Sequence, residues 1–381
     1  MSGVAILVLG MHRSGTSALT WLLGRLGAAL PSDAIEASGD NARGYWESQG
    51  LVKADDQLLR VVRSSWFDPR PLDFSRLSLD GLRSRKNRIR EAIEAAWSDA
   101  PLLAIKDPRQ CRCVPVIADV LGEMAIEPRA LLMLRSPAEI ARSLASRDGT
   151  TPAYAHLLWL RHMIEAERAT RGMMRAVVDY DGMLHDWRGT MARIAPLAGR
   201  GDWQPSDGEA AEIDSFLDPG LRHHRAAAAD LEEPLAGLVR AVDDGLRALI
   251  DCDDAAARER LDRSYGLLDN TPWLEGDIIH DELRHRRMAP EVVIEAEPRP
   301  EALQPEPAPD PSGDAALIRA SGLFDAEHYR DRYPEVAASG LDPVDHYLQI
   351  GAAKGYDPSP LFDTGYYARQ MARRMGGAGE R

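Results

Sequence analysis

Val4-Ala5-Ile6-Leu7-Val8-Leu9 is an apolar run, and it leads into the loop Gly10-Met11-His12-Arg13-Ser14-Gly15-Thr16-Ser17. Leucines recur at helical spacing behind this loop, so the pattern predicts a strand, a turn and a helix. Such a turn aims backbone N–H groups and the positive end of the helix dipole at one point. That point binds anions, most often phosphate. The hydroxyls and the arginine in the loop favour this interpretation over a plain strand-to-helix turn.

The two glycines of the loop have the spacing of a Walker A motif, G-x-x-x-x-G-K-[ST]. In that motif the lysine reaches the β- and γ-phosphates and the hydroxyl binds magnesium. Thr16 stands where the lysine belongs, and the cation lies inside the loop as Arg13. The loop therefore disfavours ATP–magnesium binding in the manner of a kinase. A P-loop phosphotransferase stays open as the alternative, and it would require magnesium.

The loop resembles the 5′-phosphosulfate loop of the sulfotransferases that use PAPS, which is 3′-phosphoadenosine 5′-phosphosulfate. The resemblance covers about residues 4–225. It implies an α/β fold in which a three-layer parallel sheet carries a P-loop-like nucleotide site. It also implies that PAPS, with PAP as its product, binds without a metal to five loop residues: Arg13, Ser14, Gly15, Thr16 and Ser17.

A second segment fits the same family. Leu131–Leu134 predicts another buried strand, and Arg135 ends it. Ser136-Pro137-Ala138-Glu139 then has the pattern of a capping box at the start of a helix. In the sulfotransferases an arginine at a strand end and a serine eight residues later hold the 3′-phosphate of PAPS. Arg135 and Ser143 match that spacing, so the resemblance implies that they bind this phosphate.

A carboxylate is the expected general base. Glu47 follows Gly44-Tyr45-Trp46 and the first predicted helix, where related bacterial and tyrosyl-type sulfotransferases carry a catalytic glutamate. Cytosolic members use a histidine two positions after a strand-end lysine instead, and Pro108 stands at that place here. The resemblance therefore implies that Glu47 takes the proton of the acceptor. The alternative is an ordinary surface carboxylate.

Lys106 closes the apolar run Leu102–Ile105 and begins the segment Lys106-Asp107-Pro108-Arg109. This segment is similar to the one that brings a lysine to the transferring sulfuryl group in the family. Lys106 is therefore expected to be catalytic, together with Glu47 and Arg13. Asp107 is expected to pair with Lys106 or Arg109, and it stays open as a second candidate base.

Two further positions allow plainer interpretations. Tyr180 follows Val177-Val178-Asp179 and resembles the tyrosine that approaches the nucleotide in the family. A core tyrosine with a satisfied hydroxyl is the alternative. Asp55-Asp56 could belong to a metal site or an acid pair, but no third ligand accompanies them. A solvated helix face is the expected role of these two residues.

Composition limits the partners and the compartment. The formal net charge of −14 argues against nucleic acid as a partner of the whole surface. Three cysteines, Cys111, Cys113 and Cys252, make neither a disulfide framework nor a metal-ligand set, which indicates a reducing cytoplasm. The first strand starts too early for a signal peptide, and no apolar run has the length of a membrane span. We therefore expect a cytoplasmic protein.

The organisation of the chain changes near residue 285. Seven prolines and several glutamates lie between Ala289 and Pro311, which predicts an extended linker over residues 286–314 between a domain of residues 1–285 and a small helical domain of residues 315–381. In the last part, Leu323-Phe324-Asp325 recurs as Leu361-Phe362-Asp363. This repeat resembles one attached to bacterial glycosyltransferases and other polysaccharide enzymes.

The expected function is transfer of the sulfuryl group of PAPS to an acceptor hydroxyl. The C-terminal repeat directs the choice of acceptor to a bacterial glycan or polysaccharide. It also indicates partners in polysaccharide assembly. A non-catalytic adaptor of such an assembly, which would bind no PAP, stays open as an alternative.

Overall fold

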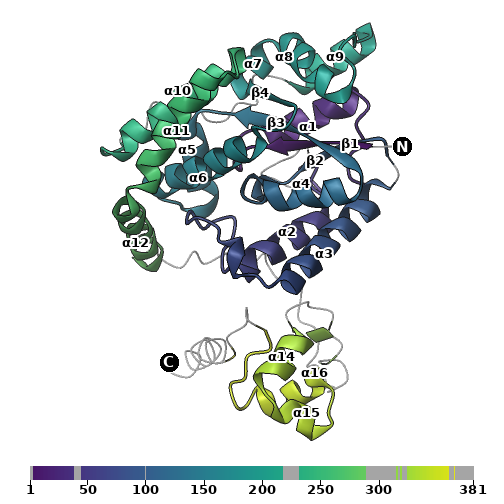
Figure 1. The fold of residues 1–381 in the computed structure, drawn as a ribbon, viewed down its shortest axis with the longest axis vertical. Coiled ribbons are helices and arrows are strands. Elements are labelled where there is room, and N and C mark those ends of the chain that lie inside the picture. Colours follow the sequence, from purple (N-terminus) through teal and green to yellow (C-terminus); the bar gives the residue numbers. More distant parts are fainter. Residues whose placement is uncertain are drawn as a thin grey trace, which may run out of the picture. The chain divides into compact units, whose positions relative to one another are not determined.

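Four short apolar segments form one parallel sheet with the strand order β2-β1-β3-β4 (Figure 1). The strands are β1 (Gly3–Leu9), β2 (Leu102–Lys106), β3 (Ile126–Leu134) and β4 (Arg175–Asp179). Side chains of β1 alternate between two hydrophobic clusters, with Leu7 in one and Ile6 and Val8 in the other. Both faces of this strand are therefore buried, and its sequence is a continuous apolar run instead of an alternating one.

Helices cover both faces of the sheet, and the predicted three-layer α/β fold with a parallel sheet is confirmed. One face packs against α1 (Thr16–Arg25), α7 (Tyr180–His185), α8 (Trp187–Ile194) and α9 (Asp207–Phe216). The hydrophobic cluster on the other face includes residues of α2 (Gln49–Val61), α3 (Leu79–Trp97), α4 (Val114–Glu123), α5 (Pro137–Asp148), α6 (Pro152–Thr170), α10 (Leu235–Asp251), α11 (Ala255–Asp269) and α12 (Pro272–Met288). Short 3₁₀ turns complete this part: η1 (Phe74–Arg76), η2 (Pro108–Arg112) and η3 (Ala195–Ala198).

The site region is set by the way the chain leaves two neighbouring strands. From β1 the chain enters α1 on one face of the sheet, and from β3 it enters α5 on the other face. Connections that diverge in this way open a crevice at the carboxyl ends of the strands, where α/β proteins bind their ligands. Gly10 lies there, since a Cβ atom added to it would be 3.0 Å from the backbone oxygen of Met133 at the end of β3.

The computed structural model describes residues 3–37, 44–98, 100–217, 231–288, 315, 318–319, 324–359 and 364. The chain divides into two compact units, Met1–Val292 and Val293–Arg381. Residues 286–288 of the predicted linker belong to α12, and the rest of the linker lies outside the described residues. The proposed domain limits therefore stay a prediction.

The second unit has a small aromatic core. It contains the helices α14 (Ala326–Arg332), α15 (Glu335–Ser339) and α16 (Pro343–His346) and the π-helical turn η5 (Tyr347–Gly351). They pack around Tyr329, Val336 and Tyr347. Leu361–Asp363, the second copy of the repeat pattern, lies outside the described residues.

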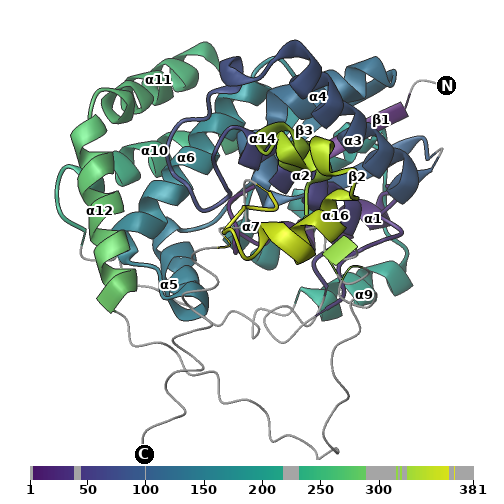
Figure 2. The ribbon, with the colours of Figure 1, turned by 90° about the horizontal axis from the view of Figure 1, so that it is seen from below.

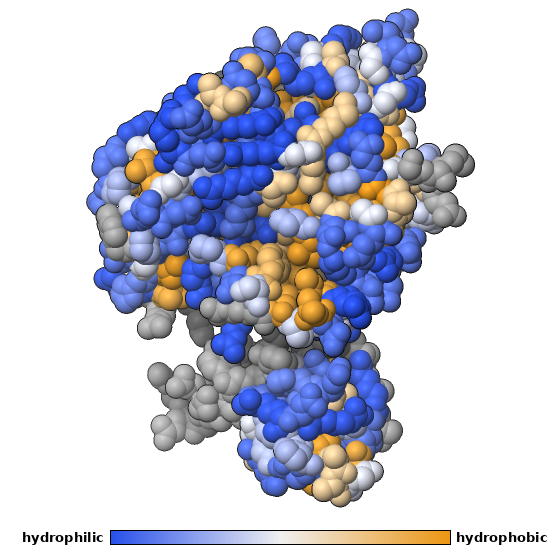
Figure 3. All heavy atoms as spheres, in the orientation of Figure 1, coloured by the Kyte–Doolittle hydropathy of each residue, from blue (hydrophilic) through white to orange (hydrophobic). Residues whose placement is uncertain are grey.

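The surface of the described part of the chain is mainly hydrophilic. On the face that Figure 3 presents, hydrophobic side chains gather near α2 and α4 of the first unit, among hydrophilic neighbours. Figure 2 shows α10, α11 and α12 grouped along one side of this unit. Within the described ranges, no helix combines the length and the apolar character needed to cross a membrane.

Helix α12 is tied to the first unit by polar contacts as well as by apolar packing. Glu282 accepts hydrogen bonds from the backbone N and the Oγ1 of Thr151, at 2.9 and 2.7 Å. Glu275 forms an ion pair with Arg161, whose side chain is only 4% exposed. Leu274 and Ile278 pack into the same core as α6. The first unit therefore extends to the end of α12.

These contacts predict the outcome of truncation. A chain that ends at Met288 should unfold cooperatively, because it keeps every contact of α12 with the first unit. A chain that ends at Asp269 lacks Glu275 and leaves Arg161 buried without this partner, which should cost about 3–5 kcal/mol of unfolding free energy. Urea unfolding followed by circular dichroism measures both. Equal stability of the two chains would contradict the assignment of α12 to the first unit.

Candidate active site

Two glycines shape the loop between β1 and α1. Gly15 caps α1 in the left-handed conformation, with φ of 95°. A Cβ atom added there would lie 2.3 Å from the ring of Tyr180, and one added to Gly10 would lie 2.6 Å from Oγ of Ser14. Arg13 also has a positive φ of 70°, a backbone conformation that residues other than glycine rarely adopt. The loop is therefore tightly curled against β3 and Tyr180.

The residues predicted to bind the 3′-phosphate lie together beside this loop. Nε of Arg13 donates a hydrogen bond to Oγ of Ser143 in α5, at 2.9 Å. Nη1 of Arg135, at the end of β3, donates to the backbone oxygen of Arg13, also at 2.9 Å. The Arg135 guanidinium lies 4.5 Å from the ring centroid of Tyr180, which is cation–π distance. These contacts thus join side chains from four segments of the chain: two arginines, a serine and a tyrosine.

Helix α5 begins as predicted but is capped differently. Ser136 is its N-cap residue and Pro137 its first residue, yet the Ser136 side chain makes no capping hydrogen bond. The predicted capping box is therefore wrong. Instead, the buried Glu139 accepts a hydrogen bond from Nε of Arg135 at 3.0 Å. A charge-assisted bond to a guanidinium is stronger than a neutral bond to a serine, so Glu139 serves to orient Arg135.

Lys106 forms a second polar centre on the other side of the loop. Its Nζ forms an ion pair with Glu47 and donates to Oγ of Ser17 at 3.2 Å and to the backbone oxygen of Tyr45 at 3.1 Å. Lys106 is 3% exposed and Glu47 is 7% exposed, so the interpretation of Glu47 as an ordinary surface carboxylate is wrong. The three N–H groups of the ammonium all have acceptors.

The backbone around Glu47 holds its side chain in this place. Its backbone oxygen accepts from the backbone N of Ile35 at 2.8 Å. Ser48 then caps α2, with its Oγ accepting from the backbone N of Leu51 at 3.1 Å. Trp46 has a positive φ of 57°, unusual for a bulky residue and therefore a point of backbone strain next to the site.

Burial raises the pKa of Glu47. The neighbouring carboxylate of Asp107 raises this pKa further, while Lys106 and Arg109 act in the opposite direction. A carboxylate with a raised pKa is a stronger base than a free glutamate side chain. The ion pair with Lys106 favours the ionised form of Glu47.

Asp107 forms an ion pair with Arg109, which was one of its two expected partners. Its Oδ1 accepts from Nη1 and from the backbone N of Arg109, both at 3.0 Å. Asp56 contacts the same guanidinium, with its Oδ1 2.7 Å from Nε. Asp55, in contrast, is fully buried, so the expectation of a solvated helix face is wrong for this residue. No local sequence signal distinguishes Asp55 from Asp56, because its partners are about fifty residues away in the chain.

Two other contacts could not be expected from the sequence. The backbone N of Gly10 donates to Sγ of the buried Cys111 at 3.1 Å, which joins the loop to η2. His12 packs its ring 4.4 Å from that of Trp66, and burial lowers its pKa well below the usual range. His12 is therefore a neutral imidazole near neutral pH.

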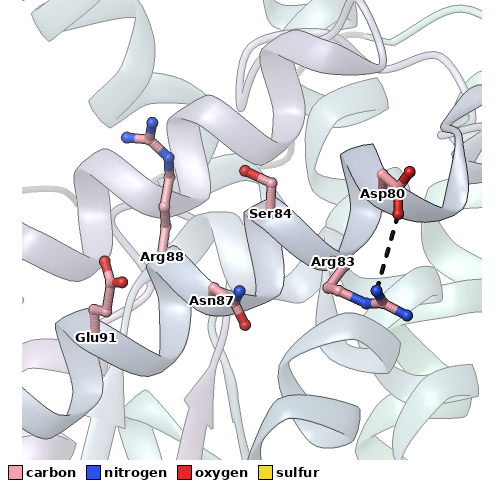
Figure 4. Close-up of a pocket in the computed structure, with 6 residues that line it drawn as sticks. All are labelled: Asp80, Arg83, Ser84, Asn87, Arg88 and Glu91. Atoms are coloured by element: carbon pink, nitrogen blue, oxygen red, sulfur yellow. Dashed lines mark ion pairs between the residues drawn. The ribbon is translucent and has the colours of Figure 1, made fainter.

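Among the described residues, neither the hollow along α3 nor the arrangement of possible metal ligands indicates a second active site. A surface hollow lies along α3 and is lined by Asp80, Arg83, Ser84, Asn87, Arg88 and Glu91, which extend from a single helix in Figure 4. Its Arg83–Asp80 ion pair, at 3.9 Å, joins side chains that are 77% and 95% exposed. Within the described ranges, no three His, Cys, Asp or Glu side chains gather in a way that could hold a metal ion.

Comparison with known proteins finds only distant likenesses. No family model matches the sequence, and no curated protein matches it. The chain is similar to the solved sulfotransferase domain from the Synechococcus PCC 7002 olefin synthase, with a TM-score of 0.36 and 16% identity, over 63% of this chain and 94% of that one. It is also similar to the sulfotransferase domain from the curacin biosynthetic pathway, with a TM-score of 0.35 and 12% identity, over 63% of this chain and 96% of that one. These likenesses carry no argument about function, which rests on the residues of the site.

The curled loop predicts a large effect of one methyl group. Gly15→Ala should lower the free energy of unfolding by about 2–5 kcal/mol, through the left-handed backbone and the overlap with Tyr180. Gly149→Ala is the matched control, since Gly149 has φ of 66° and nothing within 4 Å of an added Cβ. It should cost only the backbone term of about 1–2 kcal/mol. Urea unfolding measures both losses, and equal losses would show that Tyr180 does not pack on the loop.

Proposed function

We propose that this protein is a sulfotransferase that moves the sulfuryl group of PAPS to a hydroxyl group of an acceptor. The observation that carries the proposal is the presence of two cationic centres on either side of one phosphate-type loop. On one side Lys106 donates to Ser17. On the other side Arg13 donates to Ser143, and Arg135 donates to the backbone oxygen of Arg13. A donor with a phosphosulfate at one end and a separate phosphate at the other matches this division of charge.

The loop residues fit such an anion. The hydroxyl of Ser14 is buried and makes no hydrogen bond with the part of the chain that the structure describes. The loop leads directly into the N-terminus of α1, and backbone N–H groups at a helix N-terminus together with the helix dipole favour a bound anion. Both glycines lack the Cβ atom that would close the loop on itself. The proposed ligands of the phosphosulfate are Arg13, Ser14, Gly15, Thr16 and Ser17.

PAPS, when bound, supplies the sulfuryl group and leaves as PAP. Transfer of this kind places charge on the equatorial and leaving oxygens, so catalysis is mostly positioning and electrostatic stabilisation. We assign the stabilisation of leaving-group charge to Lys106 and Arg13. Glu47 takes the proton of the acceptor hydroxyl as that oxygen forms its bond to sulfur. Tyr180 packs against the loop and under Arg135, and in the proposal it contacts the nucleotide.

A kinase-type reaction is the weaker candidate. In a Walker loop the hydroxyl at the position of Ser17 binds magnesium. Here the Lys106 ammonium donates to that hydroxyl, and Thr16 replaces the lysine that reaches the phosphates. A positive charge therefore already stands where the divalent cation would bind.

The acceptor and the cellular setting are further parts of the proposal. We propose a hydroxyl of a glycan or polysaccharide as the acceptor, with partners in polysaccharide assembly, on the resemblance of the C-terminal repeat. The three cysteines form no disulfide, which agrees with the proposed cytoplasmic location.

The nucleotide assignment is tested by calorimetry. PAP should bind without magnesium, and a thermal-shift assay should show stabilisation by PAP and none by ATP–magnesium. Arg135→Ala should weaken PAP by about 1.5–3 kcal/mol, the value of a charge-assisted contact, and should weaken adenosine 5′-phosphosulfate less because that ligand lacks the 3′-phosphate. Arg129→Ala, in the first half of β3, is the control. Equal losses for both ligands would refute the role of Arg135.

The role of Glu47 is tested by turnover and by its dependence on pH. With a panel of sugar hydroxyls as acceptors, Glu47→Gln should keep the affinity for PAP and lose about 10²–10⁴-fold in turnover. The base must be ionised, so the wild-type kcat/KM should fall with decreasing pH. Because the pKa of Glu47 is raised, this fall should begin above the usual glutamate value of about 4.3. Wild-type turnover in Glu47→Gln would transfer the role to Asp107 or His12.

A further inference from the structure

Two carboxyl groups lie in contact beneath the site, and both are fully buried. Asp55 comes from α2, and Asp107 follows Lys106 at the end of β2. Oδ2 of Asp55 accepts from Nε2 of Gln110 at 3.1 Å, and Oδ1 of Asp107 accepts from Arg109. Their other oxygens, Oδ1 of Asp55 and Oδ2 of Asp107, make no hydrogen bond with the described residues.

Two neighbouring buried carboxyl groups, each with one unsatisfied acceptor oxygen, are unfavourable in two ways. Each buried acceptor loses its hydration without gaining a donor, and two carboxylates repel each other at low dielectric. The nearest cation does not resolve this, because the Arg109 guanidinium is shared between Asp107 and Asp56. A single proton between the two free oxygens removes both costs, since one oxygen then donates to the other.

We propose that Asp55 and Asp107 share one proton at neutral pH, that the proton resides on Oδ1 of Asp55, and that Asp55 is thereby a positioning residue for Asp107. The proton belongs on Asp55 because Asp107 receives two N–H donors from the cationic Arg109, whereas Asp55 receives one neutral amide donor from Gln110. The proton on Asp55 is then donated to Asp107, and this hydrogen bond holds the Asp107 side chain in place next to Lys106.

The other groups around the pair agree with this distribution of charge. On α2, Asp56 adds a negative charge that is paired with Arg109. Beyond η2, burial and the neighbouring Asp55 raise the pKa of the Cys113 thiol, which leaves it neutral. On the side of the site, Lys106 and Glu47 neutralise each other. Burial and then Asp107 raise the pKa of Asp55 well above its usual value.

The shared proton has a consequence at Glu47. The ionised Asp107 raises the pKa of Glu47, so Asp55 acts on the proposed base through Asp107. This consequence rests on the proposed function, whereas the proton itself does not. The test therefore detects the protonated carboxyl group itself and requires no measurement of turnover.

Infrared spectroscopy and pH-dependent unfolding of the full chain provide that test. At pH 7 the wild type should show the carbonyl absorption of a protonated carboxylic acid, and Asp55→Asn should lose it. The folded wild type holds one proton that the unfolded chain has released, so its stability falls as pH rises above the unfolded pKa. Relative to Asp55→Asn, its unfolding constant should increase about tenfold per pH unit between about pH 5 and 7.

Asp55→Asn should fold, because its amide can donate to Asp107 and its carbonyl can accept from Gln110 as the protonated acid does. Asp56→Asn is the matched control, since Asp56 is 28% exposed and paired with Arg109. It should keep both the absorption and the pH dependence of the wild type. Asp107→Asn should also lose the absorption, because its amide then donates to an ionised Asp55. An unfolded Asp55→Asn variant, or identical spectra and pH profiles for Asp55→Asn and the wild type, would overturn the proposal.

Discussion

The buried ammonium of Lys106 is the contact on which the rest of the site depends. Its three N–H groups bind Ser17 at the start of α1, the backbone of Tyr45, and Glu47 ahead of α2. Lys106 ends the edge strand β2, so one side chain joins that strand to two segments far away in the sequence. Because a buried charge without partners is costly, the loss of any of these acceptors should destabilise the site.

The carboxyl ends of the four strands meet through similar contacts. The loop after β1 accepts from Arg135, which ends β3, and Tyr180 follows β4 and packs on Gly15 and under Arg135. Arg135 is oriented by Glu139 before any ligand arrives. Groups that are positioned in advance lose little free energy of reorganisation when charge develops near them, which is the main requirement for transfer of a charged group.

A network of paired charges lies behind the site. Arg109 serves both Asp107 and Asp56, while Asp55 completes the network with a proton in place of a cation. The chain carries an excess of acidic residues, −14 overall, yet Arg13, Lys106 and Arg135 all lie at the carboxyl ends of strands. The field that an anionic ligand meets at the loop therefore depends on where these charges lie and not only on the net charge of the protein.

Local patterns were enough to predict the layers of the fold and the position of the loop between β1 and α1. The apolar runs of β1, β2 and β3, the leucine spacing of α1 and the proline after Ser136 all act over a few residues, so each can be recognised in isolation. The same holds for the apolar stripe of α10, whose leucines and valines are buried.

The partners of individual side chains depend instead on how distant segments pack. The contact of Glu139 with Arg135 in place of a capping box, the burial of Asp55 beside Asp107, and the bond of Gly10 to Cys111 all follow from packing. Hydrogen bonds and ion pairs reach only a few ångströms, so their partners are known only once the sheet has brought its strand ends together.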